Sequence, residues 1–466
     1  MPKGTKILKL KFTYWPEFMA DENQAYRAIE CKLDGFYENY VRELDLGLRR
    51  LYRVQSKELI HKLVPLKNHL NFSLYNPLGR FRGRWDSPHH YGKEVVIDAV
   101  NHDQTSTGFL SGPLLEGNWI IELETHGICS EEVTYELEVW YHQEEVEYNW
   151  YRGELHLHSH HSDGKASLVD LGKVAKENKL DFFALSDHNT ISGWKDICED
   201  EVVIIPSIEL SSYFGHAVAL GIKTYIDWRT ESTEDNITEK IKQIHSQGGL
   251  FSLAHPFTIG KPICMGCEWE YSQLPWHQVD LIEIWVRDWK NNIIQNTLAR
   301  KLWEHKLNQG FKITAIASND LHDPQDYQNN TRLPFTYVKA EQANKEHILN
   351  ALKRGKAYIS SGPEIEFKAK SENNTVLGEI GDILKSSQDK VKLSLLITKI
   401  EVKAEINLYR NGKLIYTEDI TYAKEKEIIY IVEAIGYSYY YWEIKDKNNG
   451  EVLLLSNPIF FEEGDE

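Results

Sequence analysis

Two histidines separated by one residue, His156 and His158, are the first sign of chemistry in this sequence. In an extended strand alternate side chains point to the same face, so the two imidazoles would lie side by side. Paired imidazoles suit zinc, iron or manganese, and Asp163 in the loop that follows can add an oxygen ligand. A lone His-x-His is more often an ordinary packed or surface pair, so its interpretation depends on the rest of the chain.

Four further groups of histidines and carboxylates each follow a short apolar stretch of the kind that forms a buried strand. They are Asp187-His188, Glu209 with His216, His255 before Pro256, and Asp320-x-His322. Each group alone has an ordinary explanation, as a helix cap, a solvated carboxylate or a loop histidine. Structural histidines would scatter across helices and loops, whereas these residues occur at five separate strand ends. The pattern therefore predicts a metal centre, in which Asp320 can also accept a proton from water.

The elements that must position these groups alternate between short apolar strands and longer helices. The predicted strands cover residues 182–185, 202–205, 217–221, 250–253, 281–286 and 313–317. The predicted helices cover residues 167–178, 235–247, 291–308 and 343–354. This alternation favours a parallel sheet or a closed β/α barrel, whose active sites form in the loops after the strands.

The chain on either side of this segment has the alternating pattern of half-buried β-strands. Examples are residues 8–14 and 133–139 before it, and residues 391–397 and 439–444 after it, with a hairpin turn at Asn411-Gly412. The predicted fold class is therefore multidomain, α/β plus all-β. We expect an N-terminal β-sandwich over residues 1–147, a catalytic barrel over 148–360 and an Ig-like C-terminal β-sandwich over 361–466.

The composition of the chain disfavours several classes of protein. The 466 residues include 53 Lys and Arg against 70 Asp and Glu, a net charge of −17, which disfavours a nucleic-acid partner. The sequence has no apolar run of about 18 residues, so no membrane span is expected. The start of the chain lacks the features of a signal peptide, and five cysteines do not make a disulfide framework. We therefore expect a cytoplasmic protein.

A second, weaker metal signal is the Cys264-Met265-Gly266-Cys267 motif. A structural zinc site would need two more ligands, and the sequence has no second CxxC motif. The motif is either a metal-binding or redox-active pair, or a pair of loop thiols that shape the mouth of a pocket.

In their order and spacing, the histidine and carboxylate groups resemble the PHP family, which is named for its polymerase-associated and histidinol phosphatase members. The family pattern runs His-x-His, Asp or His, Asp-His, Glu, His, His-Pro and Asp-x-His, and every element is present. The resemblance implies a distorted (β/α)7 barrel with two or three divalent metals, for which zinc, manganese and iron all suit the ligand types. The ligands that it implies are His156, His158, Asp163, His188, Glu209, His216, His255, Asp320 and His322.

The flanking segments resemble a subgroup, the CehA/McbA-like metallohydrolases. The segments that carry this likeness are residues 76–83, 112–119 and 456–459. In trinuclear members of the family the residue that corresponds to Glu209 bridges metals. The polymerase-associated members are a poor match, because no polymerase-sized module follows.

The resemblance and the residue types together predict a metal-dependent hydrolase that uses metal-activated hydroxide. Asp320 is the expected proton shuttle, and Arg287 either stabilises the developing anion or forms a surface ion pair with Asp288. We expect a phosphoesterase that acts on a small phosphate ester. One alternative is a carbamate, amide or carboxylic ester hydrolase, because the subgroup includes aryl carbamate hydrolases, and another is a non-catalytic binding protein with a degenerate barrel. We expect a small-molecule ester as partner and no membrane, and the sequence leaves a homo-oligomer open.

Overall fold

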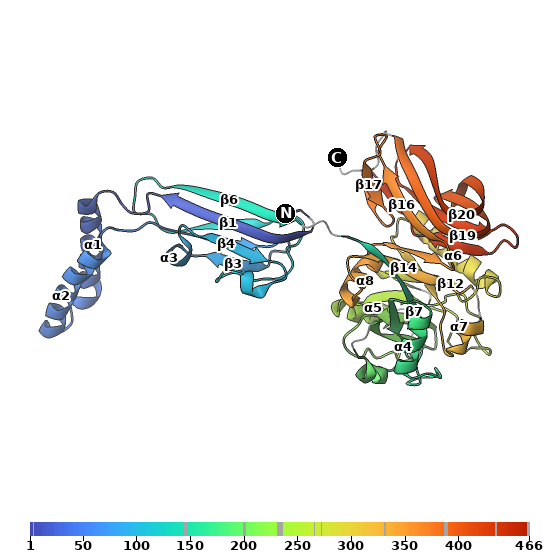
Figure 1. Ribbon diagram of the computed structural model, residues 1–466. Coiled ribbons are helices and arrows are strands. Elements are labelled where there is room, and N and C mark those ends of the chain that lie inside the picture. The colour runs from blue at the N-terminus through green and yellow to red at the C-terminus, as the bar shows by residue number, and fades with distance from the viewer. Residues whose placement is uncertain are drawn as a thin grey trace. The chain divides into compact units, whose positions relative to one another are not determined.

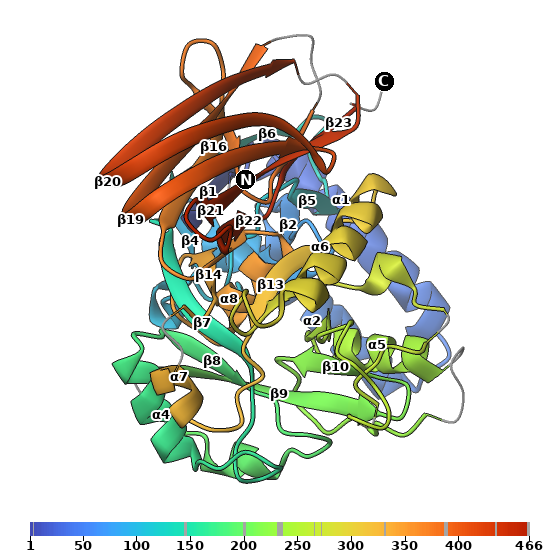
Figure 2. The same cartoon turned by 90° about the vertical axis from the view of Figure 1, so that its right-hand side faces the viewer.

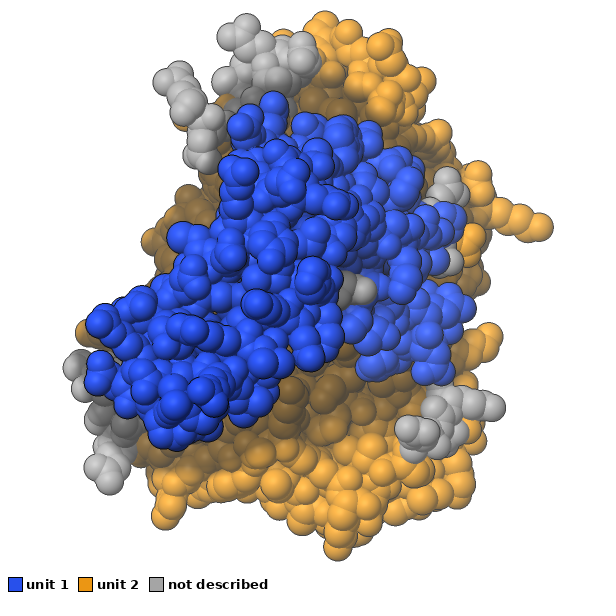
Figure 3. All heavy atoms as spheres, turned by 90° about the vertical axis from the view of Figure 1, so that its left-hand side faces the viewer, with its two compact units in different colours: residues 1–146 blue, residues 147–466 orange. Residues whose placement is uncertain are grey.

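The computed structural model describes the chain except for residues 3, 144–146, 199–201, 231–235, 265, 272, 330–331, 386–389, 434–435 and 464–466. The chain forms two compact units, unit 1 over Met1–Val146 and unit 2 over Glu147–Glu466 (Figure 3). It is a multidomain protein that combines an α/β part with many additional strands. Among the described residues, no helix is both long and apolar enough to cross a bilayer.

Unit 1 contains two three-stranded antiparallel sheets that share one apolar core. The first sheet has the order β4 (Glu94–Asp98), β1 (Thr5–Trp15) and β6 (Thr134–Gln143). The second has the order β3 (Phe81–Trp85), β2 (His69–Tyr75) and β5 (Ile120–Gly127). The alternation along β1 turns Phe12 inward, where its ring meets those of Phe72 and Trp85 edge to face. Short helical turns lie at Ser87–His90 (α3) and His102–Gln104.

Two helices interrupt the strands of unit 1, where the sequence indicated mostly β-structure. They are α1 (Glu22–Phe36) and α2 (Leu46–Leu63), joined through a π-helical turn at Tyr37–Val41. Both begin at an aspartate whose carboxylate accepts two backbone N–H bonds, Asp21 for α1 and Asp45 for α2. We call residues 21–63, with the capping Asp21 included, the helical hairpin; it extends from the sheets of unit 1 (Figure 1).

The α/β part of unit 2 is built on seven strands whose pairings follow chain order. Strands β7 (Asn149–Leu157), β8 (Phe182–Leu185) and β9 (Val203–Ser212) pair in parallel. Strand β10 (Gly215–Leu220) pairs antiparallel with β9 and with β11 (Leu250–Leu253). Parallel pairing then continues through β12 (Leu281–Val286) to β13 (Thr314–Ser318). These strands are almost wholly buried, as parallel strands covered on both faces must be.

Helices follow or precede these strands, and α4, α5, α6 and α8 lie within the four predicted helical ranges. They are α4 (Leu168–Glu177), α5 (Asn236–Ser246), α6 (Ile293–Asn308), α7 (Gln325–Asn329) and α8 (Lys345–Lys353), with 3₁₀ turns at Ser192–Asp196 and Trp276–Gln278. The strand predicted at residues 202–205 is longer in the structure, where it forms β9 and ends at Ser212. Strands β9 and β10 pair as a hairpin, which the sequence pattern did not indicate.

The remaining strands of unit 2 follow from residue 335. They are β14 (Phe335–Ala340), β15 (Ala357–Ser360), β16 (Glu364–Lys370), β17 (Val376–Glu379), β18 (Ile383–Lys385), β19 (Lys390–Arg410), β20 (Lys413–Glu433), β21 (Ser438–Asp446), β22 (Val452–Ser456) and β23 (Ile459–Glu462). Strand β14 pairs with β7, and β15 pairs with β22. The long strands β19 and β20 curve together in Figure 2 and join at the predicted Asn411-Gly412 turn, where φ is 50° and 74°.

Two buried polar contacts tie these later strands to the α/β part. Arg300 on α6 donates hydrogen bonds to Glu443 and to the Tyr441 hydroxyl, both on β21, the latter at 2.9 Å. The Asn457 side chain accepts from Ala315 N at 2.8 Å and donates to the carbonyl oxygens of Ala315 and Ala357 at 2.9 Å. Strand β13 and helix α6 are therefore held by residues that come more than 130 positions later in the chain.

Candidate metal centre

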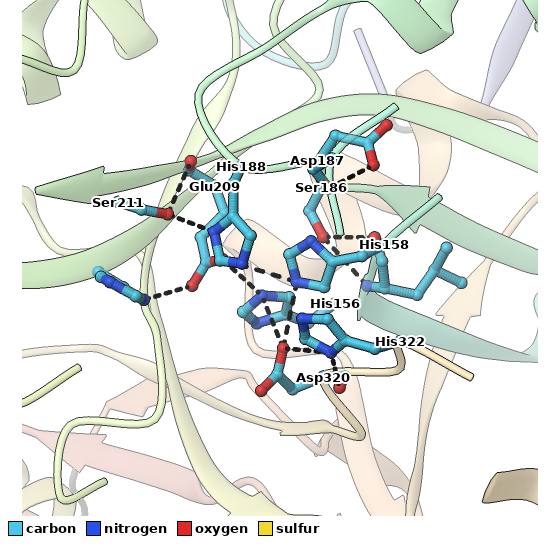
Figure 4. Close-up of polar contacts among 12 residues, drawn as sticks. His156, His158, Ser186, Asp187, His188, Glu209, Ser211, Asp320 and His322 are labelled. Carbon is cyan, nitrogen blue, oxygen red and sulfur yellow. Dashed lines mark hydrogen bonds and ion pairs between the residues drawn. The ribbon is translucent and has the colours of Figure 1, made fainter. Parts of the chain in front are cut away.

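The side chains of His156 and His158 lie together at the end of β7. Their ring centroids are 5.1 Å apart, and neither side chain is exposed. The ring of His158 also lies 4.4 Å from that of His188 and 4.2 Å from that of His322. Figure 4 shows these imidazoles directed toward one another. Histidines from the ends of β7, β8 and β13 therefore meet at one point.

The carboxylate of Glu209, on β9, lies at the middle of the cluster and is fully buried. Its Oε1 lies 3.0 Å from His216 Nδ1 and 3.1 Å from His255 Nε2. Its Oε2 lies 2.7 Å from His188 Nδ1 and 3.4 Å from His156 Nε2. The two oxygens thus face two different sets of imidazoles, which is the arrangement that lets one carboxylate bridge two cations.

Two aspartates complete the cluster on its other side. Asp320 Oδ1 lies 3.1 Å from His158 Nε2 and 3.6 Å from His156 Nε2. Asp163, the most exposed member, has its Oδ2 3.5 Å from His188 Nε2 and its Oδ1 3.3 Å from His322 Nε2. The structure thus brings together all nine residues that the resemblance implies as ligands. They fall into four overlapping groups: His158/Asp163/His188/His322, His156/Glu209/His255, His156/His158/Asp320 and His188/Glu209/His216.

The backbone is strained where three strands deliver these side chains. His255, Arg287 and Asp320 follow β11, β12 and β13, and their φ angles are 23°, 54° and 45°. Positive φ in residues other than glycine is uncommon and tends to occur at functional sites, where the surrounding structure enforces it. In the loop that carries Asp163, a Cβ on Gly164 would come within 2.3 Å of the carbonyl oxygen of His158, so only glycine fits there.

The donor atoms of the cluster fit divalent cations. Several buried atoms have no hydrogen-bond partner in the described part of the chain, namely His156 Nε2, His158 Nδ1, Glu209 Oε2, His216 Nδ1 and His255 Nδ1. Leaving a buried polar atom unpaired costs about 1–3 kcal/mol, so five such atoms in one place call for a ligand. Imidazole nitrogens mixed with carboxylate oxygens suit zinc, manganese and iron.

The ionisation of the Glu209 and Asp320 carboxylates favours cation binding. Burial alone would raise the pKa of the Glu209 carboxyl, but the charge of His156 and the other histidines around the carboxylate hold that pKa well below its usual value. The pKa of Asp320 is likewise held well below its usual value, because the hydrogen bond from His158 and nearby histidine charges outweigh burial. Burial lowers the pKa of His158, which favours the neutral, metal-binding imidazole. Both carboxylates are therefore ionised, as metal ligands must be.

Glu283 supports the cluster and was not singled out from the sequence. It is fully buried on β12; its Oε1 lies 2.8 Å from His156 Nδ1, and its Oε2 accepts a 2.8 Å bond from His255 N. It thereby orients two candidate ligands from behind, as outer carboxylates do at metal sites. Its signal in the sequence is a lone carboxylate inside the apolar run Leu281–Val286.

Glu154 and Asp187 support other parts of the site. Glu154 accepts hydrogen bonds from Asn319 Nδ2 at 2.5 Å and from His156 N at 3.1 Å, and burial raises its pKa to about 7 against the effect of these bonds. Asp187 accepts hydrogen bonds from Ser159 N at 2.8 Å and from the Ser162 hydroxyl at 2.9 Å. It holds the loop that carries Asp163 rather than joining any of the four groups.

Arg287 lies at the edge of the cluster. Its Nε donates to Asn319 O at 3.2 Å, and its Nη2 donates to Asp320 O at 3.1 Å and lies 3.5 Å from Asp320 Oδ2. The Asp288 carboxylate instead accepts a hydrogen bond from Asn291 N. The guanidinium therefore faces Asp320.

The cluster opens into a cavity of about 490 Å³. Besides the cluster, the cavity is lined by Phe257, Thr258 and the disulfide-linked Cys264 and Cys267, and by Val286, Arg287 and residues of α6 such as Gln295. The CxxC motif is thus a disulfide at the cavity wall, and no metal group found in the described part of the chain includes it. Cys31 and Cys198 are exposed free thiols, and Cys129 is a half-buried one.

Comparisons with known proteins agree with this picture. The sequence pattern of the PHP domain family matches residues 154–447. The uncharacterized protein MJ1587 of Methanocaldococcus jannaschii is 28% identical over 167 residues, which cover 32% of this chain and 93% of that protein.

Two solved structures are also similar to this chain. One is a two-domain protein of Bacteroides vulgatus that contains a predicted PHP-like metal-dependent phosphoesterase; it has 15% identity and a TM-score of 0.40, with 67% of this chain and 95% of that chain covered. The other is an amidohydrolase of Chromobacterium violaceum, with 13% identity and a TM-score of 0.26, with 37% of this chain and 88% of that chain covered.

Proposed function

Because the chain belongs to the PHP domain family, we propose that it is a metal-dependent phosphoesterase that hydrolyses a small phosphate ester. The observation that carries the proposal is the convergence of nine histidine, aspartate and glutamate side chains, among which five buried polar atoms lack a hydrogen-bond partner in the part of the chain that the structure describes. The proposal includes the finer expectations from the sequence: membership of the CehA/McbA-like subgroup, a distorted (β/α)7 barrel over residues 148–360, and flanking β-sandwiches over 1–147 and 361–466.

The four overlapping groups would hold two or three divalent metals, with zinc, manganese and iron as candidates. Glu209 would bridge two of them, because each of its oxygens faces a different set of imidazoles. When bound, such cations polarise a phosphoryl oxygen and supply hydroxide near neutral pH.

Two residues of the chain have further roles in the proposed reaction. Asp320 would accept the proton of the attacking water, since its carboxylate is ionised and lies at the floor of the cavity. Arg287 would stabilise the charge that develops on the phosphoryl group, because its guanidinium lies beside Asp320 and lines the same cavity. Glu283 would keep His156 oriented throughout.

A small ester fits this site better than a polymer. The cavity has a volume of about 490 Å³, and beside the cluster it is lined by apolar and amide side chains, among them Phe257, Val286 and Gln295. The net charge of −17 disfavours binding of nucleic acid.

A second candidate is the hydrolysis of a carbamate, amide or carboxylic ester. The observation that favours it is that Arg287 is the single Lys or Arg among the described residues that line the cavity. A doubly charged phosphate monoester would gain more from several cationic side chains than a neutral ester would.

The experiment combines a substrate panel with metal analysis. The purified full chain is assayed with p-nitrophenyl phosphate, bis-p-nitrophenyl phosphate and p-nitrophenyl acetate in the presence of manganese, and its metal content is measured by elemental analysis. His156→Ala and Asp320→Ala should each abolish hydrolysis and lower metal content, whereas His305→Ala, on an exposed face of α6, is the matched control and should change neither.

Three outcomes separate the candidates. Preference for either phosphate ester supports the phosphoesterase. Preference for the acetate supports the second candidate and overturns the first. No bound metal and no activity after metal addition would overturn both and leave a non-catalytic binding protein with a degenerate barrel. Full activity in either alanine variant would contradict the assigned residue roles.

A further inference from the structure

The helical hairpin of unit 1 exposes an unusual amount of apolar surface. Ten of its large apolar residues are between 38% and 67% exposed: Tyr26, Phe36, Tyr40, Leu44, Leu46, Leu48, Leu51, Val54, Leu59 and Leu63. Single exposed apolar residues are ordinary, but a contiguous group of this size usually marks a surface that another molecule covers.

The hairpin packs almost only on itself. Its buried residues are Ala25 and Ile29 on α1, Val41 in the π-helical turn and Ile60 on α2. The apolar core of unit 1, taken over the residues that the structure describes, includes no residue of either helix. Two helices alone cannot bury their apolar stripes, so a helix pair of this kind normally packs against further helices.

The outer faces of the two helices differ in character. On α2, Leu48, Leu51, Val54 and Leu59 recur at helical spacing and are all about half exposed. The outer face of α1 carries Arg27, Glu30 and Asp34, which are exposed polar residues. The unpartnered apolar surface therefore lies mainly along α2 and continues into the turn that joins the two helices.

Charge divides the hairpin into two opposite halves. Residues 21–45 contain seven acidic and three basic residues, a net charge of −4, whereas residues 46–63 contain five basic and one acidic, a net charge of +4. Within residues 21–63, all of which the structure describes, the ion pair that forms is Arg42 Nη1 to Glu38 Oε2 at 2.9 Å. The basic residues of α2 are thus left without an acidic partner inside their own hairpin.

We propose that the hairpin is a dimerisation surface, and that two copies of this chain join their hairpins into a four-helix bundle. In a two-fold arrangement of two helical hairpins, α2 of each copy lies beside α1 of the partner copy. The half with charge +4 then faces the half with charge −4 twice, and the leucines of α2 enter the shared core.

Charge selects a second copy over other occupants. Residues 21–63 contain eight acidic and eight basic residues, so the hairpin as a whole is neutral. An anionic membrane or a nucleic acid would need a net positive surface. A surface that is neutral overall but divided into complementary halves matches itself.

The first test measures the mass of the full chain by light scattering after size-exclusion chromatography, across a wide range of concentration. We expect a dimer, and we expect Leu48→Glu/Leu51→Glu to weaken the dimer at least about tenfold. Leu78→Glu is the matched control, because Leu78 is 65% exposed in unit 1 but lies outside the hairpin. A monomer at every concentration overturns the proposal, as does a dimer that the double variant leaves intact.

A charge-reversal experiment identifies the partner surface. One variant carries Arg50→Glu, Arg53→Glu and Lys57→Glu on α2; the other carries Glu22→Lys, Glu30→Lys and Asp34→Lys on α1. Each variant alone should be monomeric, because its two halves then carry the same sign of charge. Their mixture should form a heterodimer that weakens as salt rises, and circular dichroism of each variant checks that its helices form.

The remaining outcomes also decide the matter. A mixture that stays monomeric while both variants keep their helix content overturns the pairing of α2 with the partner copy's α1. Binding of the wild-type monomer to vesicles of phosphatidylglycerol, without any dimer, would assign the surface to a membrane instead. None of these measurements depends on hydrolysis, so they stand apart from the proposed function.

Discussion

The centre of unit 2 and the helical hairpin of unit 1 depart from the usual burial pattern in opposite directions. At the centre of unit 2, polar atoms of His156, His158 and Glu209 are buried without hydrogen-bond partners among the described residues. In the hairpin, apolar residues such as Leu51 and Val54 are exposed. Buried unpaired polar atoms and exposed apolar residues both cost free energy in an isolated chain. A bound cation would remove the first cost, and a covering surface would remove the second.

The two regions differ in how that relief would act. A cation at the metal centre would satisfy directed donor atoms whose geometry the strand ends fix, so it would be bound tightly and selectively. A second copy at the hairpin would cover apolar surface. The resulting stabilisation is roughly proportional to the area covered, so single substitutions remove only part of it. Buried polar atoms without partners thus indicate a site for chemistry, whereas exposed apolar residues indicate a surface for association.

Removal of metal should give the largest effect. Chelation with EDTA should abolish hydrolysis and lower the unfolding temperature of unit 2, because binding at a thousand times Kd stabilises by about 4 kcal/mol. Unit 1, which contains none of the nine residues, should unfold at an unchanged temperature. Scanning calorimetry with and without EDTA checks this, and manganese should reverse the effect. An identical unit 2 transition in both conditions would break the comparison.

Breaking a buried ion pair within unit 2 should give the next largest effect, a loss of folding stability. Glu443→Gln leaves the buried guanidinium of Arg300 without its carboxylate, which should cost about 3 kcal/mol of the unfolding free energy at pH 7. Urea unfolding measures it, with the exposed Glu425→Gln as control. A loss no greater than that of the control would show that the pair does not contribute to stability.

The contribution of the Arg300–Glu443 pair to stability should decrease as pH falls. Burial alone would raise the pKa of Glu443, but Arg300 and Lys445 hold it below its ordinary value of 4.5. The pair therefore stabilises the folded state fully above pH 4.5, and this contribution is lost as pH falls through the folded pKa. The difference between wild type and Glu443→Gln should shrink below pH 4.5, and a difference that stays constant down to acid unfolding would contradict this.

Glu283→Gln should have a smaller effect that is specific to metal. The amide keeps the shape of the carboxylate but loses the charge beside His156, so metal affinity should fall about 10- to 100-fold. Competition with a metal-binding dye measures it. Unchanged affinity would show that Glu283 only fills space.

A substitution on the hairpin should have the smallest effect on the stability of one chain. Leu51→Glu should change the unfolding free energy of unit 1 by less than about 0.5 kcal/mol at concentrations where the chain is monomeric. Leu10→Glu, at a residue that is 1% exposed in the core of unit 1, should prevent that unit from folding. Equal losses from both would show that the hairpin is part of the monomer's core.

The sequence predicted the clustering of the candidate ligands well because these residues follow a local rule. His188, His255 and Asp320 each come within a few residues of an apolar stretch, and the carboxyl ends of neighbouring strands meet in space. Their convergence could therefore be inferred without knowing the loops between them. Their role as ligands, and the division of the chain into three domains, stay predictions.

What the sequence did not reveal depends on contacts distant along the chain. Glu283 is a single carboxylate in an apolar strand, and its partners come from β7 and from the residue that follows β11. The helical hairpin was missed for a different reason: the alternating strand patterns of residues 8–14 and 133–139 dominated the interpretation of the whole N-terminal segment. The aspartates Asp21 and Asp45, which cap both helices, were the available signal.

The contacts of Asn457 have a consequence for synthesis of the protein. Strand β13 positions Asp320 and His322, and Asn457 bonds to the backbone of Ala315 on that strand. During synthesis on a ribosome, all nine residues of the cluster emerge long before Asn457 does. A nascent or truncated chain that stops short of this residue lacks this support of β13, so the cluster should reach its final geometry only after Asn457 has left the exit tunnel.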